Sequence, residues 1–132
     1  MSSRFSNMAN FWKADSKAAV ANALLRHRYE ISIGFTPGAT IPDYIVDRCT
    51  ITYESLRIAA GIGGIARGVG AHLRKVREWC SLRGFPPLDS FVVRNQERDP
   101  GDGYDETLES HGDWREDVRK CLVFQGYPKA IP

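Results

Sequence analysis

The sequence predicts one mostly helical α+β domain that spans residues 1–132. Its 132 residues, of which 42% are hydrophobic and 26% charged, suit a single hydrophobic core. Apolar residues recur at helical spacing over several segments, whereas the β-prone runs are short. Within the domain we distinguish an N-terminal helical and strand extension at 1–49, a central unit at 50–104, and an acidic C-terminal helix and tail at 105–132.

The N-terminal extension begins with helical periodicity. We expect an amphipathic helix, or two short ones, between Asn7 and Arg28, with Asp15 and Ser16 as candidate caps of the second. The positions at helical spacing are Met8, Phe11, Trp12, Val20, Ala23, Leu24 and His27.

The rest of the extension is less regular. Apolar and small residues alternate from Ile31 to Phe35, which predicts a short strand before the turn at Thr36–Gly38. Pro42 and Asp43 then favour a helical turn.

Two helices are expected in the central unit. Thr52 is a candidate N-cap for a short helix, Tyr53–Ala60, that ends at Gly61. A longer helix is expected from Ile65 to Leu82, before the break at Gly84. Its apolar face comprises Val69, Leu73, Val76 and Cys80, and its cations are Arg67, Arg74, Lys75 and Arg77.

A β-hairpin should follow the longer helix. Phe91–Val93 is β-prone, and Asp99–Gly103 is rich in turn residues, so a second strand is expected near Tyr104. Asp113 is a candidate cap for a final helix. The apolar face of that helix comprises Trp114, Val118, Cys121 and Leu122.

Charge is distributed unevenly along the chain, although the net charge is only +2. Residues 54–94 hold seven Lys and Arg against three Asp and Glu, whereas residues 95–132 hold five against nine. A basic centre suits a polyanion such as nucleic acid, and the alternative is a solvated charged surface. With neither a membrane-spanning run nor a secretory signal, a soluble cytoplasmic protein is expected, with no membrane partner.

The three cysteines, Cys49, Cys80 and Cys121, are far apart and sit among apolar neighbours. This pattern is typical of buried thiols and not of a disulfide framework or a zinc site, which needs closely spaced ligands. We therefore expect no metal and no cofactor.

The glycine-rich stretch at 61–70 invites comparison with phosphate-binding loops. A dinucleotide-binding fingerprint requires a preceding buried strand, and a nucleotide-hydrolase loop requires Gly-Lys-Ser/Thr, whereas here a short helix is expected first and no lysine is present. Glycines at the start of a helix can instead allow close approach to another helix or to a sugar-phosphate backbone.

Four segments of the central unit occur in a familiar order: Ile51–Tyr53, Ala60–Gly61, Ala66–Gly70 and Phe91–Val93. Together with the glycine-containing turn that follows, they resemble the C-terminal domain of the O6-alkylguanine alkyltransferases and alkyltransferase-like proteins. The resemblance implies a winged helix-turn-helix core at 50–104, with an N-terminal helical extension and a C-terminal helix.

The resemblance also implies roles for single residues. In that family the second helix enters the minor groove, so Arg67 would fill the gap left by a flipped nucleotide, and Tyr53 would lie beside the phosphate of the rotated base. Extruding a base costs a few kcal/mol, and a cation placed in the stack restores contact while neutralising phosphate.

The chain departs from the family at the reactive site. The family has Pro-Cys-His-Arg before the Val-Val strand, whereas this chain has Pro87–Phe91, without a cysteine. Alkyl transfer needs a thiolate and an adjacent base, and neither Leu88 nor Asp89 supplies this pair. We therefore expect no enzyme activity and assign no catalytic residue.

The sequence thus predicts a non-enzymatic, alkyltransferase-like protein that binds duplex DNA through its basic, glycine-rich helix. The expected DNA-binding residues are Tyr53, Arg67, Gly68, Gly70, Arg74, Lys75 and Arg77. The alternative is a protein-interaction module, such as a small phage-type inhibitor or accessory factor. Its acidic tail would then bind a nucleic-acid-handling protein.

Overall fold

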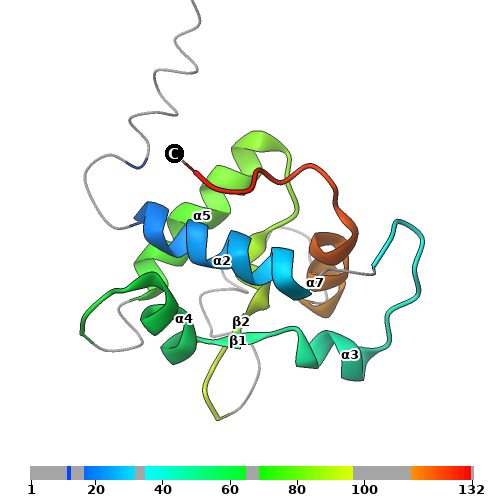
Figure 1. The fold of residues 1–132 in the computed structure, drawn as a ribbon, viewed down its shortest axis with the longest axis horizontal. Coiled ribbons are helices and arrows are strands. Elements are labelled where there is room, and N and C mark those ends of the chain that lie inside the picture. The colour runs from blue at the N-terminus through cyan, green and yellow to red at the C-terminus, as the bar shows by residue number, and fades with distance from the viewer. Residues whose placement is uncertain (1–11, 13–16, 32–34, 65–68, 97–113, 132) are drawn as a thin grey trace, which may run out of the picture.

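The computed structural model describes residue 12 and residues 17–31, 35–64, 69–96 and 114–131 (Figure 1). This part of the chain is mostly helical and carries one small sheet, so the predicted α+β class is confirmed. The elements are α2 (Lys17–Ile31), α3 (Asp43–Arg48), β1 (Ile51–Thr52), α4 (Tyr53–Ala60), α5 (Val69–Arg83), the 3-10 helix η2 (Leu88–Phe91), β2 (Val92–Val93) and α7 (Trp114–Val123). No helix in these ranges is long and apolar enough to cross a membrane.

Helix α2 lies at the centre of the fold. It runs across the middle of the molecule in Figure 1 and contacts α4, α5, η2 and α7. Burial covers most of its circumference, as expected of a helix enclosed by others. Its fully or almost fully buried residues are Val20, Ala21, Ala23, Leu24 and Leu25.

The sheet is a parallel pair of two-residue strands, β1 and β2. Ile51 pairs with Val92 and Thr52 pairs with Val93. Two residues of the β-prone run, Val92 and Val93, therefore form a strand, whereas Phe91 belongs to η2. The sequence did not predict the partner strand β1. The second hairpin strand expected near Tyr104 lies outside the described residues.

The strand expected between Ile31 and Phe35 is not supported at its ends. Helix α2 continues through Ile31, and Phe35 has no regular structure. Both side chains pack against the core while partly exposed, so their burial does not depend on a strand. Residues 32–34 lie outside the described ranges.

Helix α4 begins and ends where its local residues predict. The Thr52 hydroxyl oxygen accepts a hydrogen bond from the Ser55 amide at 3.1 Å, which caps the first turn. Gly61 ends the helix with a φ of 71°, in the left-handed region that glycine adopts readily. The Asn95 side-chain oxygen accepts from the Glu54 amide at 3.4 Å, so the residues after β2 also contact this helix start.

The C-terminal segment returns along α2 and is attached to it by polar contacts. The side-chain nitrogen of Asn22 donates to the Ile131 carbonyl at 3.1 Å, and its side-chain oxygen accepts from the Ile131 backbone amide at 2.6 Å. Arg28 donates to the Cys121 carbonyl at 3.0 Å, and its guanidinium lies 5.2 Å from the Tyr127 ring centre. These contacts close the core over the end of α7.

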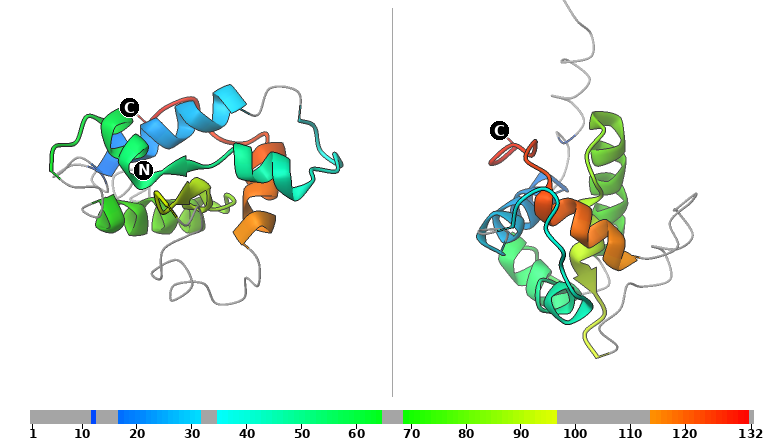
Figure 2. Two further views of the ribbon diagram at one scale, coloured as in Figure 1. Left: turned by 90° about the horizontal axis from the view of Figure 1, so that it is seen from below. Right: turned by 90° about the vertical axis from the view of Figure 1, so that its right-hand side faces the viewer.

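Helices α3 and α7 lie side by side (Figure 2) and are joined by charged groups. Arg115 donates to Asp47 at 2.9 Å, and Arg119 donates to the Ile41 carbonyl at 2.8 Å and also binds Asp43. The N-terminal extension is therefore attached to both the first and second turns of α7.

We predict that Leu24→Ala lowers the free energy of unfolding by about 2–5 kcal/mol, because it removes a fully buried side chain and leaves a cavity. Tyr29→Ala is the control, since Tyr29 lies on the same helix but is 58% exposed. Urea unfolding followed by circular dichroism measures both. Equal losses in the two variants would contradict the central position of α2.

Candidate nucleic-acid interface

Helix α5 presents one buried and one exposed face. The apolar residues predicted to face the core do so: Val69, Leu73, Val76 and Cys80 are buried, together with Trp79. The opposite face carries the exposed residues Ala71, Arg74, Glu78 and Ser81. The predicted amphipathic helix is therefore confirmed from Val69 onward.

Two of the predicted DNA-binding cations lie toward the start of this exposed face. Arg74 is exposed, and Lys75 is half-buried with its ammonium 3.8 Å from a Glu78 carboxylate oxygen. An ion pair at this distance between solvent-accessible side chains contributes little stability.

Gly70, the second residue of α5, is not required by internal packing. A Cβ atom added there would meet no other heavy atom within 4 Å. The structure thus does not support the interpretation that Gly70 allows close helix–helix contact. Gly70 is half-buried, so part of its backbone remains accessible.

Of the remaining predicted site residues, only Tyr53 belongs to the described part of the chain. Arg67 and Gly68 lie outside the described residues. Tyr53 is the first residue of α4 and is partly buried against the core, so part of its side chain remains accessible.

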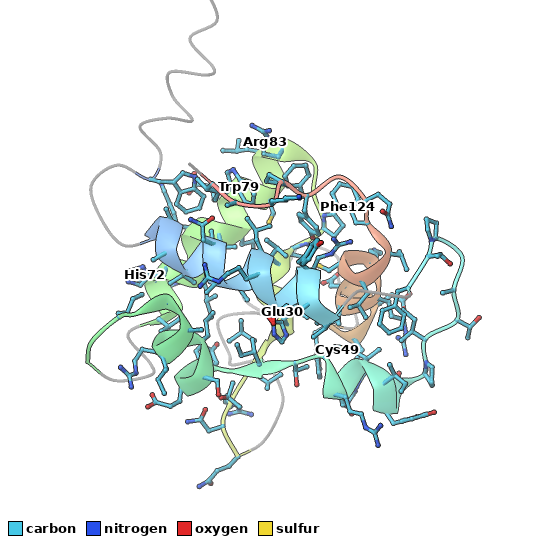
Figure 3. The ribbon with its side chains drawn as sticks, viewed as in Figure 1. Glu30, Cys49, His72, Trp79, Arg83 and Phe124 are labelled. Carbon is cyan, nitrogen blue, oxygen red and sulfur yellow. The ribbon has the colours of Figure 1, made fainter. Side chains whose placement is uncertain are left out.

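Arg83, at the other end of α5 from His72, lies with its guanidinium 5.7 Å from the Phe85 ring centre (Figure 3). Arg74, close to His72 in the sequence, therefore lies well away from Arg83 along the helix. The cations do not form one compact cluster on α5.

Arg77 differs from the expectation of an exposed phosphate contact. Its side chain is 14% exposed, and its Nε donates to Asp89 Oδ2 at 2.8 Å. A second guanidinium nitrogen binds the same oxygen. The Asp89 side chain is only 5% exposed, so this ion pair lies in the interior and joins α5 to η2. The helical spacing of Arg77 could not reveal this partner.

The electrostatics of Asp89 follow from its burial. Burial raises the pKa of this carboxyl above its ordinary value, and the charge and hydrogen bonds of Arg77 lower it in part. Asp89 Oδ1 is buried without a hydrogen-bond partner among the described residues. Burying the two charges thus costs free energy of desolvation. Removing either partner alone would leave the other charge buried and unpaired.

The segment in which the resemblance would place a reactive site, Leu88–Phe91, is buried. All four residues of η2 are buried. Behind it, the Cys121 thiol donates to the Pro87 carbonyl at 3.2 Å and accepts from the Tyr127 hydroxyl at 3.2 Å. Burial raises the pKa of both Cys80 and Cys121 to about 12, so these thiols are protonated at neutral pH.

The structure shows little of the acidic C-terminal array. Of its acids, Glu116 and Asp117 are described, whereas those from Glu97 to Asp113 lie outside the described residues. Glu116 accepts from Arg119 at 3.0 Å, and Asp117 is buried. Burial therefore excludes Asp117 from an exposed phosphate-like array, whereas the Glu116 side chain is 58% exposed.

Sequence reasoning missed Arg57, whose guanidinium binds Glu54 and also donates to the Ile62 carbonyl at 2.8 Å in the glycine-rich turn. The three-residue spacing of Glu54 and Arg57 predicts their ion pair. Nothing in the sequence predicts the bond to Ile62.

No protein-family model matches the chain, and no curated protein or solved structure matches it.

We predict that Arg77→Met lowers the free energy of unfolding by about 3–5 kcal/mol at neutral pH, because it leaves the Asp89 carboxylate buried and unpaired. The loss should be smaller near pH 4. Burial raises the folded-state pKa of Asp89 above its ordinary value of 3.8, and removal of Arg77 raises that pKa further. The loss of stability therefore grows as pH rises above the folded-state pKa of Asp89 in the wild-type protein. It disappears below that pKa, where the carboxyl is protonated in both proteins.

Urea unfolding at several pH values measures this dependence. Arg74→Met, on the exposed face of the same helix, is the matched control and should change stability little. A loss that does not vary with pH would show that Asp89 is not the group responsible.

Proposed function

We propose that the protein binds duplex DNA without acting as an enzyme, through a winged helix-turn-helix unit whose second helix is α5. The observation that carries the proposal is the open start of α5. There Gly70 has no side chain and is half-buried, Ala71 is exposed, and Arg74 is exposed on the same face. Small residues beside a cation suit close contact with a sugar-phosphate backbone.

The arrangement of the helices supports the proposal. Helix α4 ends at a left-handed glycine, a glycine-rich connection follows, and α2 contacts both α4 and α5. This is a helix–connection–helix unit supported by a third helix, as the proposal needs. The hairpin wing remains part of the proposal.

Each residue has a role in the proposed complex. Arg74 and Lys75 contact phosphates, and Tyr53 contributes a further contact at the start of α4. Arg67, which lies two residues before α5 in the sequence, enters the base stack. Arg77 has no role at the DNA, because its guanidinium already binds Asp89.

We predict that the protein binds a fluorescein-labelled duplex and that affinity falls as salt rises. Arg67→Ala with Arg74→Ala should weaken binding and reduce the slope of log K against log salt by about 0.9 per lost phosphate contact. Lys120→Ala, at an exposed position of α7, is the charge control and should leave the slope unchanged. Absence of binding at about 50 mM salt would exclude the proposal, because phosphate contacts are strongest at low salt.

A second candidate function, a protein-interaction module, is favoured by the surface of α3 and α7. Tyr44 is 63% exposed and lies 5.7 Å from the Arg48 guanidinium. Arg115, which binds Asp47, lies 4.8 Å from the Trp114 ring centre. Tyr, Trp and Arg side chains dominate the binding energy of many protein interfaces. The partner would be a nucleic-acid-handling protein.

We predict, for this second function, that a partner protein retained after nuclease treatment is lost with Tyr44→Ala and Arg48→Ala together, whereas Arg67→Ala has no effect. Affinity capture with quantitative mass spectrometry measures this. Retention by the double variant would remove the α3–α7 surface from consideration.

A further inference from the structure

All three guanidinium nitrogens of Arg57 donate hydrogen bonds, and they bind two partners. Its Nε donates to Glu54 Oε1 at 2.9 Å and its Nη2 to Oε2 at 2.7 Å. A bidentate pair of this kind fixes the plane of the guanidinium. The remaining nitrogen, Nη1, donates to the Ile62 carbonyl at 2.8 Å. The side chain thus links α4 to the turn that follows it.

Ile62 is held by Arg57 through both of its backbone polar groups. Its carbonyl accepts from the Arg57 side chain, and its amide donates to the Arg57 carbonyl at 3.1 Å. The two bonds span Gly61, whose φ is 71°. Because both groups are held, the chain leaves α4 in one orientation.

The residues beyond Ile62 do not supply that rigidity. Gly63 and Gly64 are exposed, and a Cβ atom on either would meet no atom of the described residues within 4 Å. Glycine has more conformational freedom than any other residue, so these positions cannot restrict the chain by themselves. The contacts at Ile62 are the last described ones before residues 65–68.

We infer that Arg57 is a positioning residue for DNA binding: by holding Ile62, it sets the direction in which the chain runs from α4 to the DNA-contacting start of α5. This inference rests on the proposed DNA-binding function. Arg57 does not contact DNA. It holds the turn at Gly61 and Ile62 in one conformation before DNA is bound, and so it raises affinity by preorganisation.

Two substitutions separate position from charge. Arg57→Gln removes the charge and the bidentate pair, whereas Arg57→Lys keeps the charge but cannot bind Glu54 at two points and reach Ile62 together. Both should raise the Kd for a labelled duplex by about three- to tenfold. Lys120→Gln is the charge control and should stay within about twofold of wild type.

Salt titration and hydrogen exchange show how the affinity is lost. The slope of log K against log salt should be unchanged in both Arg57 variants, because no phosphate contact is removed, whereas Arg74→Gln should reduce it by about 0.9. Amide exchange at Gly61 and Ile62 should become faster in the Arg57 variants while α5 keeps its protection. If either variant fails to fold, Glu54→Gln loosens the same guanidinium and should show the same changes to a smaller extent.

Wild-type affinity in Arg57→Lys would overturn the inference, and so would a salt slope reduced as in Arg74→Gln, since Arg57 would then contact phosphate. If the wild-type protein does not bind DNA, the proposed function fails. Unchanged exchange at Ile62 in Arg57→Gln would then also show that Arg57 does not hold the turn.

Discussion

The rest of the structure depends on the burial of α2. Its residues from Val20 to Leu25 are buried on almost every side, and most other helices contact it. Such a helix contributes to stability only when its neighbours cover it together, because each exposed apolar surface would face water. Asn22 is the polar exception within this run, and it binds the returning C-terminal segment through both of its side-chain groups. Polar and apolar contacts therefore converge on one helix.

The ion pair between Arg77 and Asp89 adds specificity to this arrangement. Replacing both groups by apolar side chains would avoid the cost of burying two charges. The pair instead requires one relative placement of α5 and η2, because a guanidinium and a carboxylate bind well only at short distance and suitable angle. In the proposed DNA complex, α5 must present its exposed face in a constant direction. A polar contact behind that helix restricts it more than apolar packing alone.

Local chemistry explains which elements could be predicted from the sequence. The cap at Thr52 and the glycine at 61 lie within or beside α4, so its limits follow from neighbouring residues. The strand β1 has two residues, too few for any periodicity, and its partner is about 40 positions away. Alternation of apolar and small residues over five positions is compatible with a strand and also with the end of a helix. The sequence around Ile31 therefore could not show that α2 continues through this residue.

For the candidate site too, local periodicity could be predicted from the sequence, whereas contacts with distant residues could not. The exposed position of Arg74 and the buried position of Val76 follow from helical periodicity. The inward position of Arg77 does not, because it depends on the carboxylate that η2 brings to it. Nor could the second role of Arg57 be read from its spacing to Glu54. It depends on the left-handed turn at Gly61, which brings the Ile62 carbonyl back toward α4.

The pairing of β1 with β2 has a consequence for how the protein can change. Paired strands lie about 4.8 Å apart, so the segment from α4 to η2 leaves and re-enters the fold at nearly the same point. In its topology the segment resembles an insertion whose two ends lie next to each other. Its exposed residues can diverge while its buried side chains, which cover α2, are kept.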